Sequence, residues 1–528
     1  MEKKTEKLSL KREVGLAGAV SLIGGTMIGS GIFMSPQTVI STIGSPGASL
    51  VVWACCGVLV IMASFCYAEL GTVIRESGGE YIYILRTAGP VVAFMLIFSS
   101  VLFVRPAGVA GIALSFAQYV VAPFYPDCPP PELLVKCMAA VAIITLATVN
   151  CLNVRFAMSL QVFFMVVKVL ALAVIIIGGM VMLVRGSNES FKDSFENTNV
   201  GINPIGIAFY QGLWSYDGWN NLNYVTEELK RPEVNLPRAV VIAISLVTGL
   251  YLLVNVSYLT VMTPKELMSS SAVAVTWGNK VLGSWGWIMS VAAALSAFGS
   301  LNGTFFSGGR VCFVAAREGH MVIIYLCDRG YVKSFGVRLL SKGCVCFVAR
   351  YSGHGSRPQI DSVPGSDLHH HHLSGGADPR RLPEHRQLLQ VKAGSAFHHH
   401  FFSKTNVQPV CGHLTFIVFT VVSFTAWFFY AITLSGLLYL KIKKPELPRP
   451  YSVPIILPIL VLIAAVFLVL APIIDSPQIE YLYVTLFIFS GILVYIPVIH
   501  YKLCPGLLTR LTVLLQLFLE VAPVEKNL

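Results

Sequence analysis

Two stretches of the chain combine glycine with polar side chains inside long apolar segments. The first covers residues 24–33 and reads Gly-Gly-Thr-Met-Ile-Gly-Ser-Gly-Ile-Phe, with four glycines in eight residues. The second covers residues 209–221 and reads Phe-Tyr-Gln-Gly-Leu-Trp-Ser-Tyr-Asp-Gly-Trp-Asn-Asn. Each glycine disfavours a continuous helix by about 1 kcal/mol relative to alanine. The two stretches therefore predict two broken helices.

A broken helix exposes backbone groups that can bind charge. The free N–H groups at the start of its second half suit a carboxylate, and the free carbonyls at the end of its first half suit an ammonium. Two breaks that face each other therefore suit a zwitterion, and an α-amino acid is the small molecule that fits most simply. For the first stretch alone, close packing of small residues between helices is the alternative.

The composition predicts an integral membrane protein. Of 528 residues, 55% are hydrophobic and only 12% are charged, and the mean hydropathy is +0.71. A soluble globule of this size needs more polar surface. No Lys/Arg-rich patch with nucleic-acid spacing occurs in the sequence, so we expect a lipid bilayer around the protein and no nucleic-acid partner.

Eleven apolar segments predict a polytopic, all-α architecture. They cover residues 15–43, 48–68, 91–122, 135–152, 157–184, 204–226, 238–262, 285–312, 423–440, 454–474 and 481–500. The breaks fall in the first and sixth segments, as two inverted five-helix repeats followed by two further helices would place them. The polar start of the chain is unlike a signal peptide, and the Lys/Arg distribution predicts that both termini are cytosolic.

Several motifs resemble one family of transporters. Residues 25–33, 77–81, 216–220 and 226–229 are similar, in this order, to motifs of the light subunits of heteromeric amino acid transporters, in the amino acid–polyamine–organocation superfamily. The resemblance covers roughly residues 15–320 and 423–520. It implies a broken-helix transporter fold, transport by alternating access, no cofactor and no enzymatic activity.

A pair of residues in the second stretch resembles one subtype of this family. Trp214 together with Asp217 is similar to the b(0,+)-type subunits, which exchange cystine and dibasic amino acids for neutral ones without sodium. An acid beside the site would favour cationic side chains through charge pairing. The resemblance also implies the plasma membrane, at the apical face of epithelial cells.

The resemblance assigns substrate contacts residue by residue. The backbone amides of Ser30 and Gly31 would hold the carboxylate, and the carbonyls of Met27, Trp214 and Asp217 would hold the amine. The Trp214 ring would act as a gate over the bound side chain. The alternative roles are packing for Trp214 and a hydrogen bond within the helix bundle for Asp217.

Two cationic residues lie inside predicted spans. Lys168 is twelve residues into the fifth segment, too deep to reach either interface easily. In relatives a lysine here resembles a substitute for the sodium ion between the first and eighth helices; a lysine that reaches a cytosolic pocket is the alternative. Arg105-Pro106 in the third segment predicts a kink and a cation that is paired within the bundle.

Cys128 lies in a predicted extracellular loop, where thiols meet an oxidising environment. It resembles the light-subunit cysteine that forms a disulfide with a single-span glycoprotein heavy subunit. We therefore expect a heavy-subunit partner linked through Cys128, with a free thiol as the alternative.

Residues 321–422 differ from the rest of the chain. They hold ten of the twelve histidines and eleven Lys/Arg against five Asp/Glu. The predicted organisation is a cytosolic tail at 1–14, helices 1–8 at 15–320, this anomalous segment in place of helix 9 and the start of helix 10, helices 10–12 at 423–501, and a cytosolic tail at 502–528. Its histidine runs suggest a second hypothesis, a metal-ion transporter with a histidine-rich loop, whose weakness is that the spans hold almost no His, Asp or Glu to pass a metal along.

A shifted reading frame explains this segment better. Histidine codons read one nucleotide later encode Thr or Ile, and in that frame residues 359–372 can spell an apolar stretch similar to the family's ninth span. The segment is therefore interpreted as out of frame or derived from an intron. We expect a product that contains it to transport nothing, and sequencing of the spliced transcript would decide this.

Overall fold

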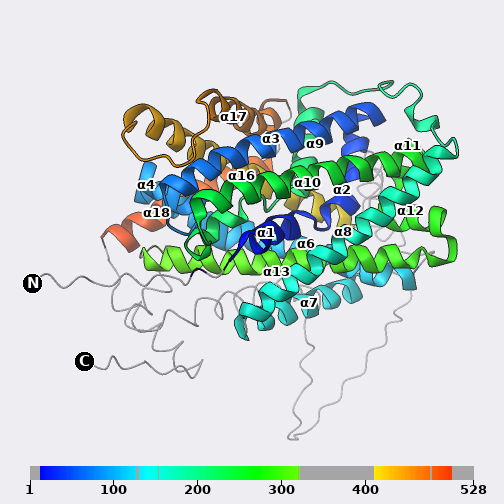
Figure 1. Ribbon diagram of the computed structural model, residues 1–528, viewed down its shortest axis with the longest axis horizontal. Helices are drawn as coiled ribbons and strands as arrows, with labels where there is room; N and C mark the ends of the chain where they lie inside the picture. Colours follow the sequence, from blue (N-terminus) through cyan, green and yellow to red (C-terminus); the bar gives the residue numbers. More distant parts are fainter. Residues whose placement is uncertain are drawn as a thin grey trace, which may run out of the picture.

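The computed structural model describes residues 12, 14–125, 130–152, 154–270, 272–318, 320, 410–475 and 479–501. These residues form a bundle of helices (Figure 1). The α-helices are α1 (Leu16–Met27), α2 (Gly31–Ile43), α3 (Pro46–Val73), α4 (Glu80–Thr87), α5 (Pro90–Ser99), α6 (Arg105–Val121), α7 (Glu132–Leu152), α8 (Val154–Val184), α9 (Ile202–Ser215), α10 (Pro232–Val261), α11 (Pro264–Ser269), α12 (Val273–Leu282), α13 (Trp287–Arg317), α16 (Val410–Lys443), α17 (Ile456–Asp475) and α18 (Ile479–Tyr495). The short helices are η1 (Ser100–Val104), η2 (Ala122–Phe124), η3 (Glu189–Phe191), η4 (Asn221–Glu228), η5 (Gly283–Trp285) and η6 (Ile496–His500).

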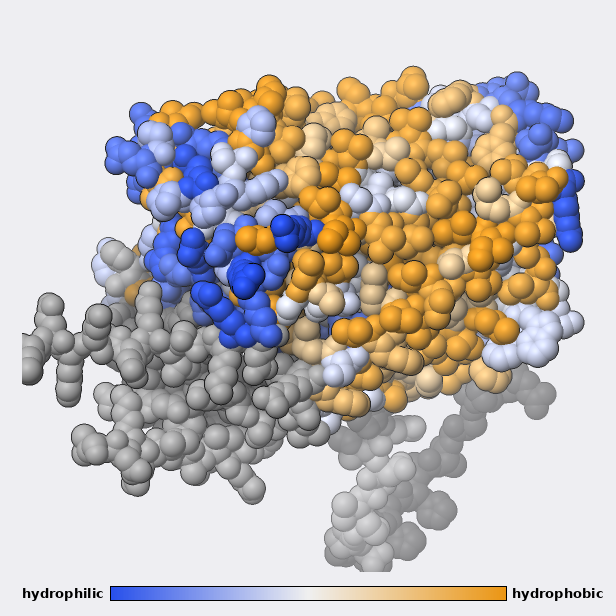
Figure 2. All heavy atoms as spheres, in the orientation of Figure 1, coloured by the Kyte–Doolittle hydropathy of each residue, from blue (hydrophilic) through white to orange (hydrophobic). Residues whose placement is uncertain are grey.

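The helices are long and apolar enough for a multi-pass membrane protein. Within the described residues, eight helices meet the length and hydropathy of a membrane span, and α1 with α2 makes nine if this bent pair is one span. The space-filling view shows apolar side chains over the middle of the molecule and polar ones toward its ends (Figure 2). On α8, Leu170 and Ile177 are more than half exposed, as lipid-facing residues are.

The first predicted break is confirmed. Helix α1 ends at Met27, α2 begins at Gly31, and the two are bent by 44°. Ile28 has ψ 83°, outside the helical range, so the α-helical hydrogen bonds stop there.

The second predicted break is also confirmed. Helix α9 ends at Ser215, and Gly218 takes a backbone φ of +97°, which residues other than glycine rarely adopt. The chain resumes at Asn221 as the 3₁₀-helix η4 rather than as an α-helix. The span that the hydropathy pattern predicts at 204–226 is therefore two half-helices.

The predicted irregularity at Arg105-Pro106 takes the form of a π-helical turn. Segment η1 lies directly before Arg105, between α5 and α6. Pro106 has no N–H to donate to the preceding turn, and a π segment is one way for a helix to absorb this. The Arg105 Nε donates to Ser100 Oγ at 3.2 Å, and its guanidinium lies 5.2 Å from the centre of the Tyr224 ring.

Helix α16 begins before the predicted start of the tenth span. It runs from Val410, whereas the sequence pattern predicts family-like chain from 423. Residues 321–409 and 502–528, which include most of the anomalous segment and the predicted C-terminal tail, lie outside the described residues.

Candidate functional site

The two helix breaks lie against each other inside the bundle. A Cβ atom on Gly31 would lie 2.6 Å from the Cα of Ser215, and one on Gly218 would lie 2.7 Å from Cγ2 of Thr26. Real Cβ atoms essentially never approach so closely. The glycines therefore serve close contact between the breaks as well as unwinding.

Tyr251 of α10 joins the two breaks. Its hydroxyl lies 2.7 Å from the carbonyl oxygen of Met27 and 2.8 Å from that of Ser215, the last residues of α1 and α9. The Met27 carbonyl also accepts from the Gly29 amide at 2.8 Å. One hydroxyl proton serves two carbonyls, so this junction has more acceptors than donors. Nothing in the sequence pattern pointed to Tyr251, because a tyrosine in an apolar span has no distinctive spacing.

The start of α2 offers free donors. Ser30 precedes this helix and is 2% exposed. None of the hydrogen bonds among the described residues uses the amides of Ser30 or Gly31. Free amides at a helix N-terminus with its partial positive charge are suited to an anion.

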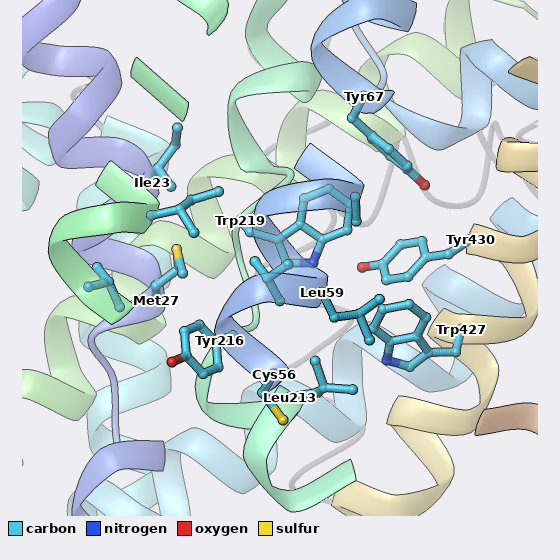
Figure 3. Close-up of a cluster of buried hydrophobic side chains, with 14 of the residues drawn as sticks. Ile23, Met27, Cys56, Leu59, Tyr67, Leu213, Tyr216, Trp219, Trp427 and Tyr430 are labelled. Carbon is cyan, nitrogen blue, oxygen red and sulfur yellow. The ribbon is translucent and has the colours of Figure 1, made fainter. Parts of the chain in front are cut away.

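A small cavity of about 30 Å³, partly open to solvent, lies beside the second break. Its lining comprises Val60, Leu213, Trp214, Asp217, Trp219, Val422, Ser423, Ala426, Trp427 and Tyr430. In the close-up, Trp427 and Tyr430 lie to one side of Trp219, and Met27 lies to the other (Figure 3). Two of the predicted site residues, Trp214 and Asp217, line the cavity, whereas Met27, Ser30 and Gly31 are buried at the first break and are absent from its lining.

Lys168 of α8 lies between the first span and α13. It is fully buried, and its Nζ donates to the Gly25 carbonyl at 2.5 Å. A Cβ on Gly299 of α13 would lie 2.9 Å from the Lys168 Cε. Among the described residues Lys168 has no acidic partner. The role of Lys168 as a substitute for a bound cation stays a prediction.

Serine hydroxyls of α13 support the first break from the same side. Ser300 donates to the Thr26 carbonyl at 2.8 Å, and Ser296 lies 3.1 Å from the Ile28 carbonyl and 3.2 Å from that of Gly29. These bonds satisfy carbonyls that the unwound backbone leaves free. They fix the break to α13.

A buried amide network lies behind the first break, and the sequence pattern did not reveal it. Asn302 of α13 donates to Gln161 Oε1 at 2.9 Å and accepts from Asn150 of α7 at 2.9 Å. The Gln161 Nε2 lies 2.7 Å from a Cβ position on Gly25 and has no hydrogen-bond partner among the described residues.

Polar contacts hold the far end of η4. Arg310 of α13 donates to both oxygens of Glu228, at 3.0 and 3.3 Å. Val14, just before α1, pairs with Leu229 as an isolated bridge. The start of the first broken span and the end of the second are thus joined.

Three features that the sequence singles out fall outside the described residues. Cys128 lies in the gap at 126–129, and both histidine runs lie in 321–409. Where side chains are described, no three His, Cys, Asp or Glu residues come together as a metal site.

Comparisons with known proteins identify the family. The amino acid permease family matches residues 14–497. The human b(0,+)-type amino acid transporter 1 is 41% identical over 523 residues, covering 98% of this chain and 95% of the relative. The human cystine/glutamate transporter is 34% identical, covering 99% and 93%, and the mouse large neutral amino acids transporter small subunit 2 is 36% identical, covering 89% and 78%.

Solved structures agree on the fold. MhsT in complex with L-phenylalanine matches with a TM-score of 0.50 at 12% identity, covering 91% of this chain and 100% of MhsT. A manganese transporter of Eremococcus coleocola also matches with a TM-score of 0.50 at 12% identity, covering 94% of each chain. These two structures show the fold alone, because both are only 12% identical to this chain. By sequence, this chain belongs to the amino acid permease family, among the light subunits of the heteromeric amino acid transporters that include the b(0,+)-type proteins.

Proposed function

We propose that this transporter exchanges cystine and dibasic amino acids for neutral amino acids without sodium, by alternating access. The observation that carries the proposal is the junction of two helix breaks beside a cavity whose lining includes Asp217. The name of the b(0,+)-type relative supports an amino acid substrate, and that of the cystine/glutamate relative supports cystine.

The substrate backbone would bind at the breaks. The Ser30 and Gly31 amides take the carboxylate, and the carbonyls of Met27, Trp214 and Asp217 take the ammonium. Tyr251 can release Met27 without leaving its own proton unpaired, because the Ser215 carbonyl lies at 2.8 Å. An arriving ammonium would then replace the tyrosine proton at Met27.

Lys168 would make sodium unnecessary. Its ammonium lies 2.5 Å from a carbonyl of the first break, beside the α13 backbone. A fixed positive charge at this place does electrostatically what a bound cation would do, and no gradient is needed to load it.

Asp217 would select dibasic side chains, with Trp214 as the gate over them. We expect Asp217→Gly to raise the KM for arginine by about fivefold, since it removes the opposite charge of an exposed carboxylate, and pairs of exposed charges contribute up to about 1 kcal/mol. The KM for leucine should change less than about threefold. Radiolabelled uptake of both amino acids measures this.

Asp193→Gly is the matched control, because Asp193 is an exposed loop residue whose φ of +56° suits glycine. It should leave both KM values unchanged. Equal losses of arginine and leucine transport in Asp217→Gly would assign Asp217 to structure and overturn its role in selectivity.

A heavy glycoprotein subunit would be linked to this chain through Cys128. With this partner the transporter would lie in the plasma membrane, and both of its termini would lie in the cytosol. Cys128→Ser should abolish a high-mass band that a reducing gel separates. Cys137→Ser, which removes an exposed thiol at the start of α7, should leave that band intact. Persistence of the band in Cys128→Ser would show that the covalent link lies elsewhere.

A further inference from the structure

The Ser215 side chain lies where the two helix breaks meet. Ser215 is the last residue of α9, and Gly31 is the first residue of α2. A Cβ atom on Gly31 would lie 2.6 Å from the Ser215 Oγ and 2.9 Å from the Ser215 Cβ. The hydroxyl is therefore in contact with the N-terminal end of α2.

This hydroxyl is buried without a hydrogen bond. Ser215 is 1% exposed, and within the described part of the chain its Oγ has no hydrogen-bond partner. A buried hydroxyl without a partner costs the folded protein stability, and such groups are few in native structures. Close packing needs only a small side chain here, and alanine would supply one without that cost. The hydroxyl therefore calls for a role other than packing.

The groups beside this hydroxyl are suited to an anion. The amides of Ser30 and Gly31 stay unused among the described residues, and the hydroxyl has a proton of its own to donate. Two amides, one hydroxyl and the partial positive charge of a helix N-terminus favour a ligand with several acceptor oxygens and a negative charge. A carboxylate is such a ligand.

Binding has to open this contact slightly. The breaks meet so closely that even a methyl group on Gly31 would clash with Ser215, so a carboxylate enters only when the start of α2 and the end of α9 move apart. The Ser215 carbonyl is separately engaged by the Tyr251 hydroxyl at 2.8 Å. The hydroxyl is therefore the part of Ser215 that is left to bind substrate.

We propose that the Ser215 hydroxyl is a third donor to the substrate carboxylate, beside the amides of Ser30 and Gly31. The inference rests on the proposed binding of the carboxylate at these two amides, and it adds a side chain to a site made otherwise of backbone groups. Ser215 then contributes affinity for every α-amino acid, because each of them carries the carboxylate.

Ser215→Ala in the intact, in-frame transporter with its heavy subunit tests this contact. The substitution removes the hydroxyl and keeps the carbonyl that Tyr251 approaches. The KM values for leucine and for arginine should both rise about tenfold, because a hydrogen bond to a charged group is lost. Radiolabelled uptake of each amino acid measures these values.

Ser99→Ala is the matched control. Ser99 of α5 is also fully buried, and its Oγ likewise has no partner among the residues that the structure describes. Helix α5 packs against α4 and α18 rather than against the breaks. This variant should leave both KM values unchanged.

Thermal unfolding in detergent separates binding from packing. Without substrate, Ser215→Ala should unfold at the temperature of the parent protein or above it, because it loses an unpaired buried hydroxyl. Leucine should raise the Tm of the parent protein by mass action, and the same leucine concentration should raise that of Ser215→Ala less.

The possible results separate this contact from the exchange of dibasic amino acids. Unchanged KM values in Ser215→Ala would overturn the contact and leave the proposed function standing. A lower Tm of the substrate-free variant would assign Ser215 to packing and overturn the contact as well. If the parent protein takes up leucine but no arginine, the proposed dibasic exchange fails, and the leucine measurements still decide the role of Ser215.

Discussion

Tyr251 concentrates the coupling between the two breaks in one hydroxyl group. It is fully buried, and the carbonyls that it approaches, of Met27 and Ser215, end the first halves of both broken helices. Tyr251→Phe keeps the ring and removes this link. The Met27 carbonyl keeps the Gly29 amide as a donor, so the loss falls on the Ser215 carbonyl, and a buried acceptor without its donor costs about 2 kcal/mol. This loosens the junction of the two breaks, so the KM should rise by up to about thirtyfold, equally for arginine and leucine, because the breaks bind the backbone that both share.

Tyr258→Phe is the matched control for this prediction. Tyr258 lies two turns further along α10, is fully buried, and has a hydroxyl without a hydrogen-bond partner among the described residues. Its variant should transport like the parent protein. Similar KM changes in the two variants would show that Tyr251 acts only through packing.

Single residues could be predicted from the sequence where their type is unusual for an apolar span. Glycines and an acid in an apolar span are unusual enough to identify both breaks and Asp217. Tyr251 and Gln161 could not be predicted, because their importance depends on contacts such as that of Tyr251 with Met27, 224 positions away.

Between elements, a buried ion cluster ties α3 to the end of α16. The Glu69 carboxylate is fully buried, with Oε1 2.7 Å from Lys441 Nζ and 3.3 Å from Arg449 Nε, and Oε2 accepts from the Val453 amide at 2.8 Å. Helix α16 also carries cavity residues, among them Trp427. The cluster therefore fixes the end of a helix that walls the cavity.

Removing this carboxylate should destabilise the protein. Glu69→Gln leaves two partly buried cations without their counter-charge, and breaking such a pair around a buried carboxylate costs about 3 kcal/mol. Thermal unfolding in detergent should show a clear drop in Tm. Glu132→Gln is the control, because its pair with Lys136 is exposed and contributes about 0.5 kcal/mol or less. Equal Tm shifts in the two variants would contradict a stabilising role of the cluster.

Hydropathy predicted the elements better than their boundaries. The span with the second break was expected at 204–226, and the structure divides it into α9 and η4. Helix α16 begins at Val410 rather than near 423. A hydropathy pattern reports the burial of a segment, whereas the end of a helix depends on local backbone geometry such as the positive φ of Gly218.

For the whole molecule, the helix bundle and the family could be predicted from the sequence. The origin of residues 321–422 is a separate question. Alignments to the relatives extend across this segment, since they cover 98% of the chain. Its proposed origin in a shifted frame stays a prediction, and with it the expectation that a product containing it is inactive. The transport assay therefore has to compare two chains: the chain exactly as its sequence reads, which we expect to be inactive, and the intact transporter with this segment in the family-like frame.

Uptake of labelled arginine into sodium-free vesicles that contain the intact, in-frame transporter and its heavy subunit, preloaded with leucine, tests sodium-independent exchange most directly. We predict uptake that depends on internal leucine and is the same when sodium is added, because Lys168 supplies the cation's charge beside Gly25. Strict dependence on sodium, or arginine uptake that ignores internal leucine, would contradict sodium-independent exchange. Amino acid uptake by the chain exactly as its sequence reads would contradict the frame-shift interpretation of residues 321–422.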